Sequence, residues 1–162
     1  MFAPSKSTTM ATAEKYAIDK EIKVLCVTAS SFPEGVLSAH QKLHSIFPLS
    51  DGRRFYGISR SNNKGEIVYK AAVEELHEGE AEKFGLETFI IKKGEYISEL
   101  LKEWRKDEKL VEKTFKKLLA DPGIDKNGYC LEMYLNEKDM RCMVPLKTPD
   151  YGNKLKLIPM FI

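Results

Sequence analysis

Apolar positions in the first half of the chain follow first a strand pattern and then a helical one. Residues 22–29 (IKVLCVTA) form a β-rich apolar run of strand length, and the SSFP sequence after it contains residues that open helices. Residues 33–47 carry one apolar stripe with helical spacing. Residues 54–59 and 66–76 are two strand-like runs separated by the turn-forming sequence SNNKG. This half predicts a strand, a helix and a β-hairpin.

The second half repeats that order without repeating the sequence. Residues 86–97 are strand-like, residues 97–104 (ISELLKEW) predict a short helical piece, and residues 110–119 carry an amphipathic stripe that ends at DPG. Residues 129–135 and 139–146 predict a second hairpin. The expected fold is therefore α+β, with two β-α-β-β modules related by pseudo-two-fold symmetry and an antiparallel sheet whose helices cover one face.

The length favours one compact domain. A chain of 162 residues with 43% hydrophobic residues buries one sizeable core and is too short for two ordinary domains. Residues 1–20 are rich in Ser, Thr and Ala and predict a flexible tail, so the domain is expected over residues 21–146. Residues 147–162 form a C-terminal extension that ends in LIPMFI, for which an edge segment of the sheet and a cover over a groove both stay open.

Charge and cysteine content exclude several classes of function. The 26 basic and 24 acidic residues are interspersed, which gives no electrostatic footprint for direct nucleic-acid binding or for a membrane surface. Cys26, Cys130 and Cys142 have no metal-ligand spacing and suit a reducing compartment, so we expect a cytoplasmic protein. His40 and His44 are four residues apart, but nothing nearby completes a zinc site. No metal or cofactor is expected.

The second hairpin gives the sharpest chemical signal. If its turn closes on two residues, Glu137 and Lys138, Met133 lies opposite Cys142 and one face is wholly apolar. The other face then carries Cys130, Glu132, Tyr134, Arg141, Met143 and Pro145. This register places Cys130 and Cys142 on opposite faces, where they cannot form a disulfide.

Two interpretations of Glu132 stay open at this point. In a concavity between the modules, a carboxylate with aromatic walls attracts a hydrophobic cation through charge and cation–π contact. In solvent it is an ordinary strand glutamate, within side-chain reach of a diagonal ion pair with Arg141. The location of this face decides between them.

Four segments occur in a characteristic order: FYGIS (55–59), YKAAVEEL (69–76), KKGEYISELLKEW (92–104) and DKNGYCLEMYL with DMRCMVPL (125–146). This order of motifs resembles the GyrI-like family of small-molecule-binding domains, which is related to the effector-binding domains of AraC-type and MerR-type regulators. The resemblance runs from about Lys23 to Leu146. It implies two SHS2-like modules with a central groove, in agreement with the pattern of elements.

The resemblance also implies a site. Its groove glutamate, which receives hydrophobic and often cationic compounds, matches Glu132. The candidate ligand-binding residues are Glu132, Tyr134, Tyr56, Tyr96, Trp104 and Met143. Met133 stands where some relatives have an aromatic residue after the glutamate. Too few residues precede the first strand for a helix-turn-helix, so we expect a stand-alone module.

Three functions follow from these residues and the resemblance. The first is binding of a small organic ligand for sensing or sequestration, without catalysis. The second is hydrolysis of strained electrophilic natural products, with Glu132 as the base that activates water. The third is inhibition of a protein such as DNA gyrase, for which no residue of this chain can be mapped. We expect the first, from a monomer or weak homodimer whose protein partner, if any, the sequence does not name.

Overall fold

Eight strands and three short helices make up the part of the chain that the structure, a computed structural model, describes, which is residues 13–148. The strands are β1 (Glu14–Ile18), β2 (Ile22–Thr28), β3 (Phe55–Ser61), β4 (Ile67–Glu74), β5 (Glu87–Ile91), β6 (Gly94–Leu101), β7 (Cys130–Tyr134) and β8 (Met140–Pro145). The helices are α2 (Val36–Ile46), α3 (Glu80–Phe84) and α4 (Lys109–Leu119), with 3-10 turns η1 (Leu49–Asp51) and η2 (Trp104–Lys106). The predicted α+β class is confirmed.

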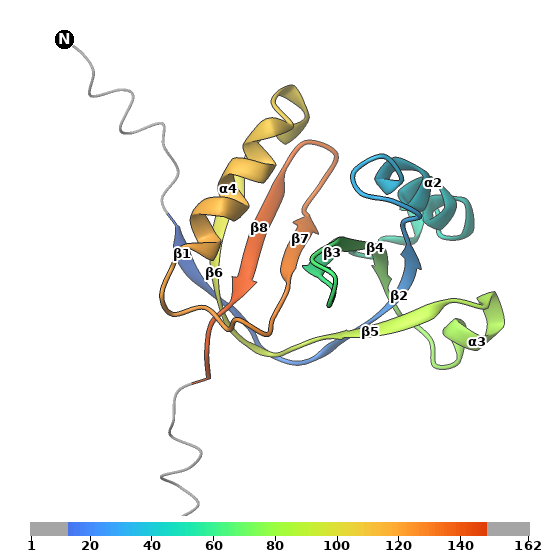
Figure 1. The fold of residues 1–162 in the computed structure, drawn as a ribbon. Helices are drawn as coiled ribbons and strands as arrows, with labels where there is room; N and C mark the ends of the chain where they lie inside the picture. Colours follow the sequence, from blue (N-terminus) through green and yellow to red (C-terminus); the bar gives the residue numbers. More distant parts are fainter. Residues whose placement is uncertain (1–12, 149–162) are drawn as a thin grey trace, which may run out of the picture.

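All strands belong to one antiparallel sheet that curls into a half-barrel (Figure 1). Its order is β1-β6-β8-β7-β3-β4-β2-β5. The two halves of the sheet have matching strand orders. From one edge inward, β6, β8 and β7 follow one another in the half that contains α4, and from the other edge inward, β2, β4 and β3 follow one another in the half that contains α2. The two halves meet where β3 pairs with β7, so any site between them lies along these two strands.

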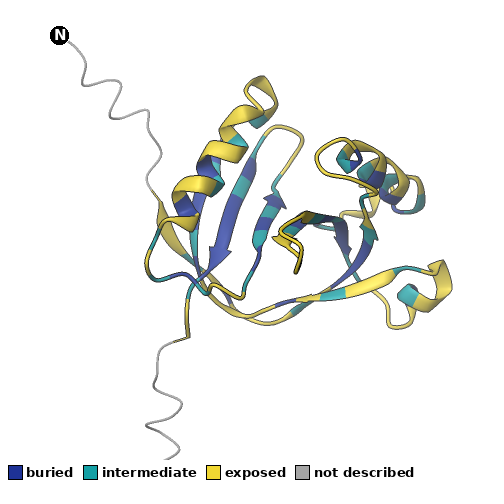
Figure 2. Cartoon of the chain, viewed as in Figure 1, coloured by how far each residue is buried: buried dark blue, intermediate teal, exposed yellow. Residues whose placement is uncertain are grey.

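Each face of the sheet has its own core. On one face, α2 packs over a cluster that includes Leu25, Leu43 and Phe47, and α4 packs over another that includes Leu118 and Cys142. The outer sides of both helices are exposed (Figure 2). The other face holds a single cluster to which Ile18 of β1 and Ile91 of β5 both contribute, so the sheet curls around it. Burial of this apolar surface is the main source of stability.

Two expectations about secondary structure are wrong. Residues 14–18, predicted as tail, form β1 and pair with β6, for example Tyr16 with Tyr96. Residues 97–101, predicted as the start of a helical piece, belong to β6, and only residues 104–106 form a helical turn. Pairing with β8 along residues 98–101, and with β1 at Ser98, overrides the helical propensity of SELL.

The register of the second hairpin differs from the expected one by a single residue. Glu132 pairs with Cys142 and Met133 pairs with Arg141. The turn closes on three residues instead of two, since the Leu135 N–H donates to the Asp139 carbonyl at 3.0 Å. A one-residue slip moves every side chain of β8 to the other face. The prediction that one hairpin face is wholly apolar is therefore wrong.

The corrected register changes two further predictions. Cys142 shares a face with Cys130, although all three cysteines are free thiols. Arg141 points to the face opposite Glu132, where it contacts Glu14 at 3.0 Å. The diagonal ion pair between Glu132 and Arg141 is therefore excluded.

No helix within residues 13–148 has the length and apolar character that crossing a membrane requires. The predicted extension over residues 147–162 lies, from residue 149 onward, outside the described residues.

Candidate functional site

Glu132 lies at the seam between the two halves of the sheet. It occupies the middle of β7 and pairs with Gly57 of β3. A Cβ atom at Gly57 would overlap the hydroxyl oxygen of Tyr69 and the Oε1 atom of Glu132. The glycine therefore makes room for the carboxylate to lie across β3 and meet a side chain of β4.

Two phenols hold the carboxylate. The hydroxyl of Tyr69 donates to Glu132 Oε1 at 2.7 Å, and that of Tyr134 donates to the same oxygen at 2.6 Å. The Nε2 atom of His40, on α2, lies 2.8 Å from the Tyr69 hydroxyl. Because this hydroxyl already gives its proton to Glu132, it accepts from His40, which assigns the tautomer protonated at Nε2. The cluster joins α2, β4 and β7.

The carboxylate of Glu132 has no cationic partner in the part of the chain that the structure describes. Among residues 13–148 it forms no ion pair, and its hydrogen bonds come from neutral phenols. Burial raises its pKa, which the two hydrogen bonds partly oppose. Glu132 nevertheless keeps part of its surface accessible. It is a costly charge that the fold does not neutralise.

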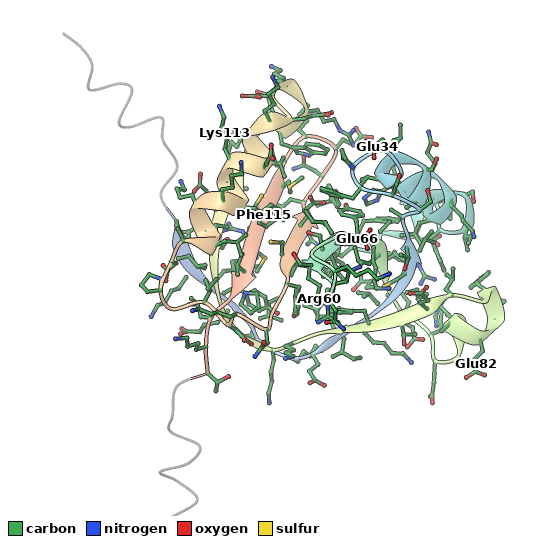
Figure 3. The ribbon with its side chains drawn as sticks, viewed as in Figure 1. Glu34, Arg60, Glu66, Glu82, Lys113 and Phe115 are labelled. Atoms are coloured by element: carbon green, nitrogen blue, oxygen red, sulfur yellow. The ribbon has the colours of Figure 1, made fainter. Side chains whose placement is uncertain are left out.

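A groove of about 1010 Å³ opens above this cluster. Figure 3 labels Glu34, in the turn before α2, at the edge of the space between α2 and the β7–β8 hairpin. Phe32 stacks on Tyr69 with ring centroids 6.0 Å apart on the α2 side. Trp104 lies 5.9 Å from the Tyr134 ring on the opposite side. The walls are therefore aromatic and the carboxylate lies between them.

The groove holds a neutral histidine at ordinary pH. Burial lowers the pKa of His40 to about 4, so its ring carries no charge near pH 7. Its ring meets that of Tyr134 edge to face at 5.4 Å. His44, one turn further along α2, stacks on Phe55 at 4.2 Å and also has a lowered pKa because of burial. Neither ring offsets the charge of Glu132.

The structure separates the predicted site residues into two groups. Tyr134 and Trp104 lie beside Glu132 in the groove. Tyr56, Tyr96 and Met143 instead belong to the cluster on the opposite face. The role of these three residues in ligand binding stays a prediction.

The cause differs among these three residues. Tyr56 precedes Gly57 on β3, so it points away from Glu132 and borders the groove only as a buried core residue. The Tyr96 hydroxyl lies 2.7 Å from that of Tyr129 and donates to the Lys92 carbonyl, which satisfies it inside the core. Met143 changes face because of the one-residue register shift.

Sequence reasoning missed Tyr69, His40 and Phe32. Tyr69 reaches Glu132 only because β3 lies between β4 and β7, and the order of strands cannot be read from one sequence. The spacing of His40 and His44 indicates at most a metal ligand, whereas the structure places His40 against the hydroxyl of Tyr69. No group of three His, Cys, Asp or Glu that could hold a metal ion occurs within residues 13–148. The signal available was Gly57 in a buried strand, because such a glycine often marks the close approach of another group.

Comparison with known proteins identifies the fold. No protein-family model and no curated protein matches the sequence. Among solved structures, SAV2435 bound to tetraphenylphosphonium matches with a TM-score of 0.62 and 10% identity over 88% of this chain and 98% of that one. The chain has the GyrI-like fold. At such identity the likeness concerns the fold alone.

Two further structures share the GyrI-like fold of this chain. An integron cassette protein from Vibrio cholerae matches with a TM-score of 0.61 and 12% identity, over 83% of this chain and 95% of that one. EcmrR, solved in a complex with DNA, matches with a TM-score of 0.57 and 11% identity. The match covers 90% of this chain and 61% of EcmrR.

Proposed function

We propose that this chain is a GyrI-like small-molecule-binding module whose groove receives hydrophobic organic cations at Glu132. The observation that carries the proposal is a carboxylate with no cationic partner among residues 13–148, set in an aromatic groove. A bound cation would supply the charge that the fold does not. The module would sense or sequester its ligand.

Physical chemistry favours a large, weakly hydrated cation. A compact ammonium loses strong hydration on entering a groove, whereas a cation spread over apolar groups loses little. Trp104 and Tyr134 offer ring faces for cation–π contact, which strengthens as water is excluded. His40 stays neutral near pH 7 and does not repel the ligand.

The symmetry of the sheet supports this location. We regard the halves β2-α2-β3-β4 and β6-α4-β7-β8 as duplicated modules, because their elements occur in the same order and meet at β3 and β7. A junction between two equal modules leaves space between their helices, as ligand sites often require. Glu132 lies on one of the two strands at this junction.

Binding is favoured over hydrolysis by the state of the neighbouring groups. Burial holds the pKa of Tyr69 and of Tyr134 well above the ordinary value, so both phenols keep their protons near pH 7. They donate to Glu132 and stabilise its charge, which suits an ionic contact better than removal of a proton from water. Met133, which follows the glutamate, is buried in the core on the other face.

Thermal unfolding with matched probes tests the proposal. Tetraphenylphosphonium is the cationic probe, chosen because SAV2435 was solved with it, and triphenylphosphine oxide is a neutral aromatic control. At about 100 times its dissociation constant a ligand adds roughly 2.7 kcal/mol, or some 5 to 10 °C for a domain of this size. We expect that shift for the phosphonium with wild type and little for the oxide.

Glu132→Gln is the decisive variant and Glu99→Gln its control. Glu99 is also a strand glutamate of the same sheet, but it pairs with Lys117 outside the groove. We expect Glu132→Gln to lose the phosphonium shift and Glu99→Gln to keep it. Equal shifts in all three proteins would overturn the proposal. Mass spectrometry of the recovered probe, and of an electrophilic compound incubated with the protein, distinguishes binding from turnover.

A further inference from the structure

Two arginines that line the groove, Arg54 and Arg105, form no ion pair with a carboxylate among residues 13–148. Arg54 donates to the Tyr134 carbonyl at 3.3 Å, and Arg105 lies over the ring of Trp104. Arg105 lines the groove from η2, next to Trp104. Its Cζ atom lies 4.7 Å from the centroid of the Trp104 ring, and its Nε–H donates to the Glu137 carbonyl at 3.3 Å. These two contacts place the exposed guanidinium over one wall of the groove.

The terminal N–H groups of Arg105 are unused by the described residues. Within residues 13–148 Arg105 pairs with no carboxylate, although Glu108 and Glu137 also line the groove. Its neighbour Lys106 does have such a partner, because it contacts Glu103 at 2.9 Å. A guanidinium that is held in place but unpaired is ready to bind an oxyanion in two-point fashion.

The charge of Arg105 acts across the groove. It contributes to the lowered pKa of both His40 and His44, which lie on α2, the opposite wall. Contacts also link it to the floor, because Trp104 contacts Tyr134 and Tyr134 donates to Glu132. A ligand seated at Glu132 therefore extends toward a fixed positive charge.

We infer that Arg105 is a specificity-determining residue, and that the preferred ligand is an organic cation that also carries a carboxylate. The cationic centre lies at Glu132 between the aromatic walls, and the carboxylate meets Arg105 at the mouth. This inference rests on the proposed function and narrows its ligand class. A ligand with only a cation meets repulsion from Arg105, which also covers a face of Trp104.

Two phosphonium probes that differ in one group test this inference. Pentyltriphenylphosphonium carries a plain alkyl chain, and (4-carboxybutyl)triphenylphosphonium ends the same chain in a carboxylate. Titration calorimetry on the full chain at pH 7 measures both affinities. We expect wild type to bind the carboxylated probe about three- to fivefold more tightly, the size typical of a partly exposed ion pair.

The variants separate this inference from the proposed function. Arg105→Gln is expected to remove the preference and to bind the plain probe no more weakly than wild type, whereas Lys106→Gln is expected to keep the wild-type preference. Glu132→Gln is expected to weaken the binding of both probes. If wild type binds both equally, or if Arg105→Gln keeps the preference, the inference is wrong while the proposed function stands. If neither probe binds, both fail.

Discussion

Two glutamates of this protein show opposite electrostatics. Glu80, at the start of α3, is buried and accepts two hydrogen bonds from the Arg53 guanidinium at 2.8 and 2.7 Å. It also accepts from the backbone N–H groups of Leu76 and His77. The Arg53 side chain holds the pKa of Glu80 at about 2. Among residues 13–148, Glu132 accepts hydrogen bonds from neutral donors only, and burial raises its pKa.

The difference distinguishes a carboxylate that stabilises the fold from the one that we propose as the binding carboxylate. The fold completes the shell of Glu80 with a cation and two backbone donors, so its charge contributes to stability. Among residues 13–148 no cation contacts Glu132, so its charge costs stability, and in our proposal a bound ligand supplies the missing charge. An uncompensated charge that lowers stability at a groove is typical of functional sites.

Breaking the ion pair between Glu80 and Arg53 is expected to have the largest effect on stability. Glu80→Gln leaves the buried Arg53 guanidinium with the more distant carboxylate of Asp51, at 3.6 Å, in place of its two-point contact with Glu80, which costs about 3 kcal/mol of unfolding free energy. Urea denaturation at pH 7 measures it, with Glu82→Gln, an exposed glutamate of the same helix, as the control. Wild-type and Glu80→Gln midpoints that coincide would show that the pair is not a source of stability.

Closing the space beside the binding carboxylate is expected to have the next largest effect. Gly57→Ala puts a methyl group where Glu132 and Tyr69 lie, so the protein loses about 2 kcal/mol through overpacking. It also loses its phosphonium-induced shift, because the carboxylate is displaced. Thermal unfolding with and without tetraphenylphosphonium measures both. An alanine variant that still responds to the probe would contradict the geometry of the seam.

Removing one of the hydrogen-bond donors that contact Glu132 is expected to cost less unfolding free energy. Tyr134→Phe deletes a hydrogen bond to Oε1, which lowers stability by about 1 kcal/mol and weakens phosphonium binding because the charged carboxylate is less stabilised. Tyr129→Phe is the matched control, since its hydroxyl bonds to Tyr96 on the opposite face. We expect a similar loss of stability there with unchanged affinity. Unchanged affinity of Tyr134→Phe for the phosphonium would contradict the role of the Tyr134 hydroxyl in stabilising the charged carboxylate of Glu132.

Neutralising the binding carboxylate is expected to have the smallest effect on stability, and of opposite sign. Burial raises the pKa of Glu132 in the folded state above its ordinary value. Between these two pKa values the folded state binds more protons than the unfolded state, so stability falls as pH rises through this range. Wild type therefore loses stability relative to Glu132→Gln above about pH 4.5. Melting curves from pH 4 to 7 should show the variant unfolding at or above the wild-type temperature, with a gap that narrows in acid. A variant that melts well below wild type at pH 7 would mean that the charge is satisfied by the fold.

The elements of this fold follow from local patterns. The stripe that ends at Leu119 and the apolar run after Ile22 predict α4 and β2 because each periodicity involves neighbours in the sequence. Strand β6 is not predictable this way, since residues 98–101 (SELL) become a strand through pairing with β8, which is distant in the sequence. The position of β7 in the sheet, which sets the surroundings of Glu132, is equally non-local.

The site was predictable in its centre and not in its surroundings. Alternation along β7 places Glu132 and Tyr134 on one face in any register, so both lie together in the structure. The residues of β8 that lie opposite β7 depend on the length of the turn. The Asn136 side chain accepts hydrogen bonds from the N–H groups of Lys138 and Asp139, and the turn closes on three residues. Tyr69 comes from two strands away and has no local signal.

Proton release on ligand binding tests the central claim most directly. Titration calorimetry of tetraphenylphosphonium in buffers of different ionisation enthalpy, at pH values from 4 to 8, counts the protons displaced per ligand. If the cation meets Glu132, wild type releases up to one proton in the acidic part of this range and none well above the pKa of Glu132, whereas Glu132→Gln releases none. Binding without proton release throughout, or equal release by both proteins, would contradict the assignment of Glu132 as the cation-binding carboxylate.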